Sequence, residues 1–565
     1  MSKPRAEMKS DQNKISVSAR VSEWSRGHPV LTIVFVALLA VIINCYPVIF
    51  CGRSYVSPIS VNGALVYAWW PPLPGMTPSP RVQQHDSDTG AMMWWDVPLG
   101  FVEARSIMEH GEIPLWNRYS HCGDILLGQA VSMLGDPLQM IVILGHGAAG
   151  AWDIKFLAEK FLFCVGFGWL VLRLFGSRPL SVIYTALAAY CGAYIFIDNH
   201  PAFFVLAYAP WILLSAVELL DLNSARYVRW GLVWLLANFA CFNAGHVEMA
   251  VALIGGLNLA ALAYSLTLCP NVFNAAKILG RMVAATLIFS GLSAPMWMAF
   301  LSALKNSSTA HDKILVTQLP LTSLPGAFED IFYHLLNDYY EMRAPGTSLL
   351  VLVGCLFSAL RWRQLKAERF FWVNVGALTL WGGFVFGWIP ASLIAAIPFF
   401  NRVSHIHTDF SYLLVIHLTI QSAYGFKSLL KAETFRQAAV DFILIGAILG
   451  GMLLAYCFAK GSFWFIHYYV VLAGAGAIGA PLLFKFLKSR HHHISIVGWA
   501  AIIICGFIPN ARFGLYNFGA PRLMMIPGLR EVLDARSRAI DKIKADESDP
   551  FRVAGLGWIF IGDYS

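Results

Sequence analysis

Long apolar runs separated by short polar turns are the feature that most constrains this chain. A run of about 18 or more apolar residues is long enough to cross a bilayer as a helix. Only 13% of the residues are charged, about half of the share that is usual in soluble domains. The pattern therefore predicts an all-α polytopic membrane protein with about 13 transmembrane helices. In such a protein Lys and Arg residues first report topology. The net charge of +8 is therefore no sign of nucleic-acid binding, and we expect no nucleic-acid partner.

The apolar runs differ in how well they fit one span. Residues 228–268 are too many for a single helix, and Asn243, Ala244, Gly245 and His246 interrupt them, so we divide the run there. Residues 125–150 are only mildly apolar and are expected to form interfacial or re-entrant helices. Residues 391–400 are expected only to dip into the membrane. The other predicted spans are 29–50, 154–175, 179–197, 202–222, 278–304, 348–360, 370–389, 410–424, 438–458, 463–487 and 494–508.

Charged residues in the turns predict which side of the membrane each turn faces. Lys or Arg occurs in every second turn, at 173–178, 221–229, 277–281, 361–369, 427–436 and 485–490. The turns between them, at 198–201, 243–248 and 460–461, carry one Lys and no Arg. Because cytoplasmic loops are enriched in basic residues, we expect a cytoplasmic N-terminal tail at 1–28 and a transmembrane domain at 29–508. The loops at 51–153 and 305–345 and the C-terminal segment at 509–565 are then extracytoplasmic.

An acidic stretch at 85–124 lies in the first predicted outer loop. Its first carboxylates, Asp86, Asp88 and Asp96, are the candidate catalytic residues. A carboxylate there could act as a general base on an acceptor hydroxyl, or bind a divalent cation beside a phosphate leaving group. Asp96 has an alternative role as the N-cap of the next helix, which we expect at 101–110, ended by Pro114.

Other polar residues stand at the predicted outer ends of later spans. Arg402 suits phosphate binding because its guanidinium is always charged and forms forked hydrogen bonds. His405 and His407 follow, and they could contact phosphate, bind metal with Asp409, or be a polar entry to the next span. His246 and Glu248 lie at the membrane break, where ionisable groups are functional candidates or a mutually hydrogen-bonded pair.

Four short motifs stand in order along the chain: GEIPLWN at 111–117 followed by the Cys122-Gly123-Asp124 turn, AGHVE at 244–248, IPFFNR at 397–402 and DPFRVAG at 549–555. Together they resemble motifs of YfhO-like bacterial membrane proteins. The chain departs from the family pattern at Arg118, Val247 and Glu248, and its C-terminal segment is shorter than the outer domain of that family.

The resemblance implies a glycosyltransferase of the GT-C superfamily in a bacterial inner membrane. Such an enzyme takes a sugar from a polyprenyl-phosphate donor to an extracytoplasmic acceptor, here an envelope glycan, lipid or protein. Its catalytic acid would lie in the first outer loop, where Asp88 and Asp96 are. Asn117 and Arg118, within the first motif, become candidate substrate-binding residues with Arg402, His405, His407, His246 and Glu248. On physical grounds alone, Asn117 could simply cap the next turn. A divalent cation is a candidate cofactor.

Two other function classes are compatible with the residues. A transporter or flippase of lipid-linked glycans often has two similar membrane halves, and no internal repeat is evident here. A non-catalytic envelope scaffold would bind cell-wall polymers through its outer loops. The scaffold hypothesis predicts that changing single carboxylates has no effect.

Overall fold

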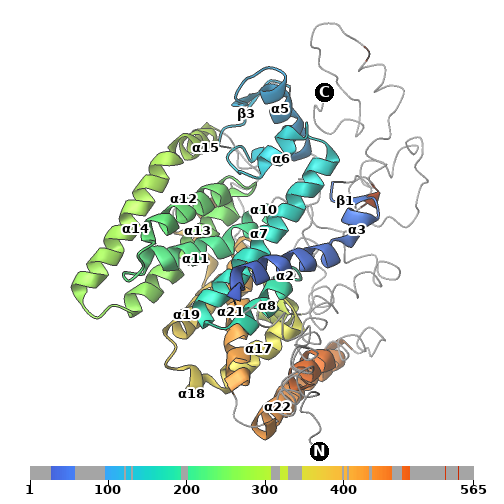
Figure 1. Cartoon of the computed structure of the whole chain (residues 1–565), viewed down its shortest axis with the longest axis vertical. Helices are drawn as coiled ribbons and strands as arrows, with labels where there is room; N and C mark the ends of the chain where they lie inside the picture. The colour runs from blue at the N-terminus through green and yellow to red at the C-terminus, as the bar shows by residue number, and fades with distance from the viewer. Residues whose placement is uncertain are drawn as a thin grey trace, which may run out of the picture.

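The structure is a computed structural model, a body of closely packed helices (Figure 1). The predicted span at 494–508 and most of the loop at 305–345 lie outside the described residues. The described residues are 27–56, 96–119, 123–128, 132–191, 202–306, 318–328, 347–397, 400–403, 406–431, 435–460, 474–483, 528–529 and 545.

Helices form nearly all of the described regular structure. The first set is α2 (Pro29–Asn44), α3 (Tyr46–Phe50), α5 (Val97–Met108), α6 (Gln139–Leu144), α7 (Ala149–Phe175), α8 (Arg178–Ala188), α10 (Ala202–Ala207), α11 (Ala209–Leu220), α12 (Tyr227–Phe242) and α13 (Val247–Thr267). The second set is α14 (Val272–Leu292), α15 (Ala294–Asn306), η4 (Leu321–Ala327), α17 (Leu349–Leu360), α18 (Trp362–Leu365), α19 (Arg369–Phe386), α20 (Ala391–Ala395), η5 (Phe400–Arg402), α21 (Ile406–Lys431) and α22 (Phe435–Lys460).

Two short ladders modify the all-α prediction. β1 (Arg53–Ser54) pairs antiparallel with β4 (Gly528–Leu529), which brings the start of the first predicted outer loop beside the C-terminal segment. β2 (Trp116–Asn117) pairs with β3 (Asp124–Ile125), so the PLWN motif and the turn after it form a small hairpin. Gly123 in this hairpin has φ of +99°, and a Cβ there would lie 2.5 Å from the Trp116 ring. Only glycine fits that position without strain.

The core has two centres, α7 and α21. Helix α7 packs against α2, α8 and α11, and α21 packs against α13, α17 and α19. Small residues permit the closest approaches: a Cβ on Gly168 would lie 1.9 Å from Thr185 of α8, and one on Gly425 would meet the Gly354 backbone of α17. Such small-residue contacts are typical of helices packed within membranes.

Helix α14 shows most directly that the body needs a bilayer. It is one of three described segments that are long and apolar enough to cross a membrane. The other two are Phe203–Leu220, which comprises α10 and α11, and Val247–Thr267, which is α13. Only 6% of α14 is buried by protein, and it stands at the edge of the body (Figure 1). Val272 and Phe273 are 85% and 68% exposed. An apolar surface of this extent marks a membrane or protein contact, and the length and composition of α14 suit a membrane span. The predicted number of 13 spans stays a prediction.

The structure corrects several predicted boundaries. The division of residues 228–268 is confirmed, because α12 ends at Phe242 and α13 begins at Val247. The single span at 278–304 is wrong: α14 ends at Leu292, where Ser293 Oγ bonds the Phe289 carbonyl at 2.7 Å, a contact that often bends helices. The basic residues at 277–281 therefore lie inside α14 and not in a turn. The helix predicted at 101–110 runs instead over Val97–Met108, ending before Gly111 and well before Pro114.

Basic side chains hold together the helix ends that lie away from α5 and α6. Arg173, in the last turn of α7, pairs with Glu218 and with Asp221 at 2.8 Å. Arg281 donates to the last carbonyls of α11, and Arg369 donates to the Thr267 carbonyl at the end of α13. Cations are favourable at helix C-termini. These Arg residues lie at the end of the body that the sequence predicts to be cytoplasmic.

Candidate functional site

Asp96 is the one predicted catalytic carboxylate that the structure describes. It precedes α5, but its φ of −71° and ψ of −43° are helical, and its side chain makes no capping hydrogen bond. The alternative in which Asp96 caps the helix is therefore wrong. Its side chain is instead buried, and neither carboxylate oxygen has a hydrogen-bond partner among the described residues. Asp86 and Asp88 lie outside the described residues.

The buried face of helix α5 carries a second carboxylate, that of Glu103. Its buried residues are Leu99, Gly100, Glu103, Ala104 and Ser106. A Cβ on Gly100 would lie 2.8 Å from the Trp152 ring of α7, so this glycine allows the two helices to approach closely. Glu103 is fully buried, and its Oε2 accepts a hydrogen bond of 2.8 Å from Gln139 of α6.

Lys155, in the second turn of α7, lies among these groups and is fully buried. Its Nζ is 2.8 Å from Asp136 Oδ2 and 2.7 Å from Gln139 Oε1. It also contacts Met133 Sδ at 2.9 Å and lies 4.4 Å from the centre of the Phe204 ring. A lysine is almost never fully buried unless it is paired, so these contacts explain its position.

Asp136 has more hydrogen-bond donors around it than the other carboxylates of the group. Besides Lys155, the Leu138 backbone N–H donates to its Oδ1 at 3.0 Å, and so does the Tyr208 hydroxyl. Glu159, one turn after Lys155 on α7, faces Asp136 and Tyr208. We call Asp96, Glu103, Asp136 and Glu159, gathered around Lys155, the carboxylate cluster.

Burial makes two members of the carboxylate cluster weak acids. It raises the pKa of Asp96 well above its usual value; the Lys155 charge opposes this shift, and Glu103 adds to it. Burial likewise raises the pKa of Glu103 to about 8, against the lowering effects of the Gln139 hydrogen bond and Lys155, and with a smaller rise from Asp136. A carboxylate whose pKa lies near the working pH can both take up and release a proton.

A second group of ionisable residues forms where α13 and α21 begin. His246 is the N-cap of α13: its Nδ1 accepts a hydrogen bond of 3.3 Å from the Met249 backbone N–H. The same Nδ1 lies 3.5 Å from Glu248 Oε2 and 3.8 Å from Asp409 Oδ1, in the first turn of α21. Gly245, at φ of +105°, allows the sharp turn before it. The predicted pair His246 and Glu248 thus gains Asp409, and we call the three the histidine cluster.

The two clusters are neighbours. Asn243, at the end of α12, packs against Gly135, where a Cβ would lie 2.8 Å from the Asn243 side chain. Gly135 immediately precedes Asp136 of the carboxylate cluster, and Asn243 lies three residues before His246. The break between α12 and α13 therefore joins both groups of candidate residues.

The remaining predicted site residues are less fully placed. His407 is buried in the first turn of α21. Arg402 ends η5, with its side chain outside the described part, and His405 also lies outside it. Asn117 accepts a 3.0 Å hydrogen bond from the Tyr119 backbone N–H, and Arg118 pairs with Glu112 at the surface. These contacts of Asn117 and Arg118 involve neither cluster. Among the residues that the structure describes, no three His, Cys, Asp or Glu side chains are arranged to hold a metal ion.

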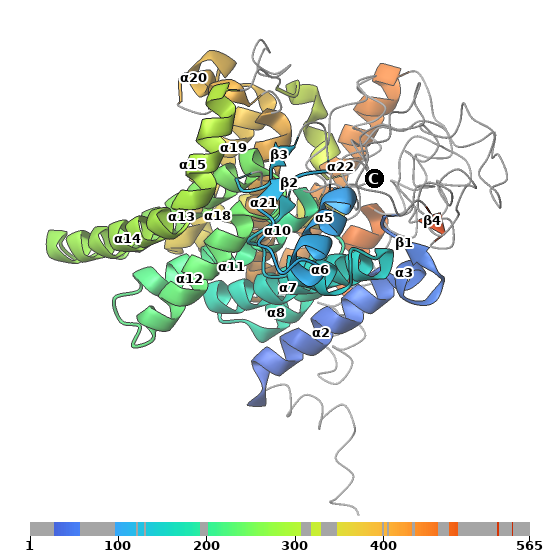
Figure 2. The same ribbon diagram turned by 90° about the horizontal axis from the view of Figure 1, so that it is seen from above.

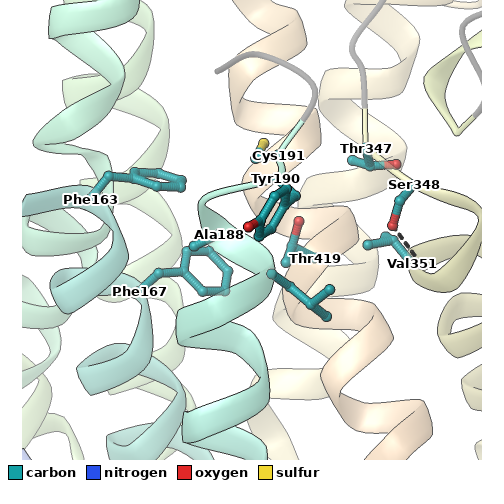
Figure 3. A pocket seen from close by; sticks show the side chains of 10 residues that line it. Phe163, Phe167, Ala188, Tyr190, Cys191, Thr347, Ser348, Val351 and Thr419 are labelled. Atoms are coloured by element: carbon teal, nitrogen blue, oxygen red, sulfur yellow. Dashed lines mark hydrogen bonds between the residues drawn. The ribbon is translucent and has the colours of Figure 1, made fainter. Parts of the chain in front are cut away.

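An apolar cavity begins one turn beyond Glu159 on α7. It is small, with a volume of about 20 Å³, partly open to the outside, and lies between α7, α8, α17 and α21. Figure 3 shows Phe163 and Phe167 on one side of it, with Thr347, Ser348 and Val351 on the other. Its remaining lining is Leu187, Ala188, Tyr190, Cys191 and Thr419.

The sequence analysis missed Lys155, Glu159, Gln139 and Tyr208, and it did not single out Glu103 or Asp136. A signal was present for the first two, because Lys155, Glu159 and Lys160 stand in the first turns of an otherwise apolar helix. Ionisable groups in such positions mark functional sites. The roles of Gln139 and Tyr208 depend on tertiary contacts that no local pattern reveals.

No family model matches the chain, and no curated protein matches it. Among solved structures, the chain is similar to ArnT from Cupriavidus metallidurans in the apo state, with a TM-score of 0.35 and 13% identity over 75% of this chain and 74% of that chain. It is also similar to that ArnT bound to undecaprenyl phosphate, with a TM-score of 0.33 and 12% identity over 76% and 78%. Both TM-scores are low, so the function has to be argued from the residues of this chain. Membership of the YfhO-like family stays a prediction.

Proposed function

We propose that this chain is a membrane glycosyltransferase of GT-C type, which transfers a sugar from a polyprenyl-phosphate donor to an extracytoplasmic acceptor. The acceptor is an envelope glycan, lipid or protein, and the membrane is a bacterial inner membrane. The observation that carries the proposal is Asp96, a buried carboxylate with both oxygens unpartnered among the described residues and subject to the charge of Lys155.

Asp96 has the chemistry of a general base. It takes the proton of the acceptor hydroxyl while that oxygen forms a bond to the anomeric carbon. The bond from the anomeric carbon to the phosphate oxygen breaks, and the polyprenyl phosphate leaves with its electron pair. Because burial raises the pKa of Asp96, its carboxylate is a stronger base than an exposed aspartate. One base and a direct displacement give inversion at the anomeric carbon.

A polyprenyl-phosphate donor needs contacts for its phosphate and for its sugar. In the same proposal, Arg402, His405 and His407 contact the phosphate. His246 and Glu248 contact the sugar or the acceptor, and Asn117 and Arg118 contact the acceptor from the outer hairpin. The proposal also allows a divalent cation bound by Asp86 and Asp88.

The position of the carboxylate cluster favours an enzyme over a transporter. Helix α7 has 27 residues, about 40 Å at 1.5 Å per residue, and Arg173 lies in its last turn, at the cytoplasmic end. Lys155 is in its second turn, roughly 10 Å from the opposite end. Transporters place substrate and ion sites near the middle of the bilayer, whereas this cluster lies near the first turns of α7, which in this proposal are at the outer surface.

The proposal is tested with purified protein in lipid nanodiscs and polyprenyl-phosphate donors labelled in the sugar. We expect polyprenyl phosphate to appear and label to pass to an envelope acceptor fraction. Proteoliposomes with the same donors then measure movement across the bilayer without cleavage. Movement with no cleavage supports a flippase, and neither movement nor cleavage across the donor panel supports a scaffold.

A further inference from the structure

Lys155 is a fully buried cation whose neighbours come from several elements (Figure 2 shows α5, α6, α7 and α10 together). The groups that contact it or interact with its charge are Asp96 before α5, Glu103 of α5, Met133 and Asp136 before α6, Gln139 of α6, Trp152 and Glu159 of α7, and Phe204 of α10. Four of these are carboxylic acids and none is a cation. Lys155 is therefore the positive charge of the group within the described part of the chain.

The ammonium group of Lys155 is held at a fixed place. An ammonium has three N–H donors, and Nζ has three close partners in Asp136 Oδ2, Gln139 Oε1 and Met133 Sδ. Asp136 is fixed in turn by the Leu138 backbone N–H and the Tyr208 hydroxyl. These contacts place the charge independently of Asp96, because none of them involves Asp96.

Asp96 depends on that charge more than Asp136 and Glu103 do. Asp136 has donors of its own, and Glu103 accepts a hydrogen bond from Gln139. Asp96 has no hydrogen-bond donor among the described residues, and the charges that act on it are Lys155, which favours its ionised form, and Glu103, which opposes it. A buried carboxylate without a nearby cation stays protonated at neutral pH.

We propose that Lys155 is a positioning residue for the transfer reaction: its ammonium group is fixed by Asp136 and Gln139 and gives the Asp96 carboxylate the neighbouring positive charge that lets it serve as a base. The inference rests on the proposed function, because it assigns Asp96 the role described there. Lys155 touches neither donor nor acceptor in this account. It acts through Asp96, which accepts the proton of the acceptor hydroxyl.

The pH profile of kcat/KM tests this inference in the purified full chain. Lys155→Met keeps an unbranched side chain of similar length and removes the charge. Without the charge, Asp96 ionises only at higher pH, so we expect the acidic limb of the profile to move up by about one pH unit or more. Lys160→Met is the matched control: Lys160 is a buried lysine of the same helix, bonded to Asn44, and is not among the charges that act on Asp96. We expect its acidic limb to stay in place.

A double variant keeps the test decisive if Lys155→Met does not fold. Lys155→Met with Asp136→Asn removes the buried pair together and leaves no unpaired charge, and Asp136 is not among the charges that act on Asp96. The same upward movement of the limb is expected. A lower rate with an unmoved limb in either variant overturns the inference and leaves Lys155 a structural residue. If the wild-type protein transfers no sugar, the proposed function itself fails, and that result is distinct.

Discussion

The side-chain nitrogen of Lys155 lies 2.8 Å from Oδ2 of Asp136, and neither side chain reaches the surface. The pair links α7 to the turn before α6, which packs against the break between α12 and α13. It thus ties the carboxylate cluster to the helices that carry the histidine cluster.

Breaking this pair from one side should destabilise the protein strongly. Removing one partner of a buried ion pair costs about 3–5 kcal/mol, because the other charge is left uncompensated. We expect Lys155→Met to lower the free energy of unfolding by that amount in detergent-micelle denaturation. Adding Asp136→Asn should restore much of the loss. A single variant as stable as the wild type would show that the pair is not formed.

Glu103 should make stability depend on pH. Burial raises its pKa from 4.5 to about 8, so the folded chain keeps a proton that the unfolded chain releases at lower pH. The folded state then binds more protons, and its stability falls as the pH rises from about 4.5 to about 8. Glu103→Gln should flatten this fall and keep the Gln139 hydrogen bond. The control is Glu109→Gln, at an exposed carboxylate paired with Arg105, which should leave the fall unchanged.

His246 has two separable roles. As an N-cap it supports α13, and replacing it by Ala should cost about 0.5–2 kcal/mol. Asparagine is a good N-cap, so His246→Asn should keep the stability of the wild type. If His246 also contacts substrate, His246→Asn should raise KM for the donor or the acceptor. Kinetics equal to those of the wild type would restrict His246 to capping.

The sequence predicts the helices better than it predicts the site. Asn243 and Gly245 interrupt the run at 228–268, and the structure begins α13 just after them. Ser293 gave no such signal, because a serine in an apolar run is compatible with a continuous helix; the bend depends on its bond to the Phe289 carbonyl.

Asp96 shows why the site was only partly predicted. Its sequence context, before Val97 and Pro98, is the same for a capping residue and for a buried acid. Which of the two it becomes depends on α5 packing against α7, where Gly100 admits the Trp152 ring. Asp96 was identified as a candidate, but its counter-charge, Lys155, comes from a helix that begins more than fifty residues later.

The central claim is that Asp96 is the base of sugar transfer, and single-turnover consumption of a polyprenyl-phosphate donor tests it most directly. Asp96→Asn keeps the shape of the side chain but cannot take up the proton. Asp153→Asn is the matched control: Asp153 is a buried carboxylate of α7 whose Oδ1 accepts from Ser54 Oγ and Tyr55 N at 3.0 and 2.9 Å, which an asparagine oxygen can also do. We predict a loss of about 10²-fold or more for Asp96→Asn and a rate near wild type for Asp153→Asn. An Asp96→Asn protein that consumes donor as fast as the wild type would contradict the account.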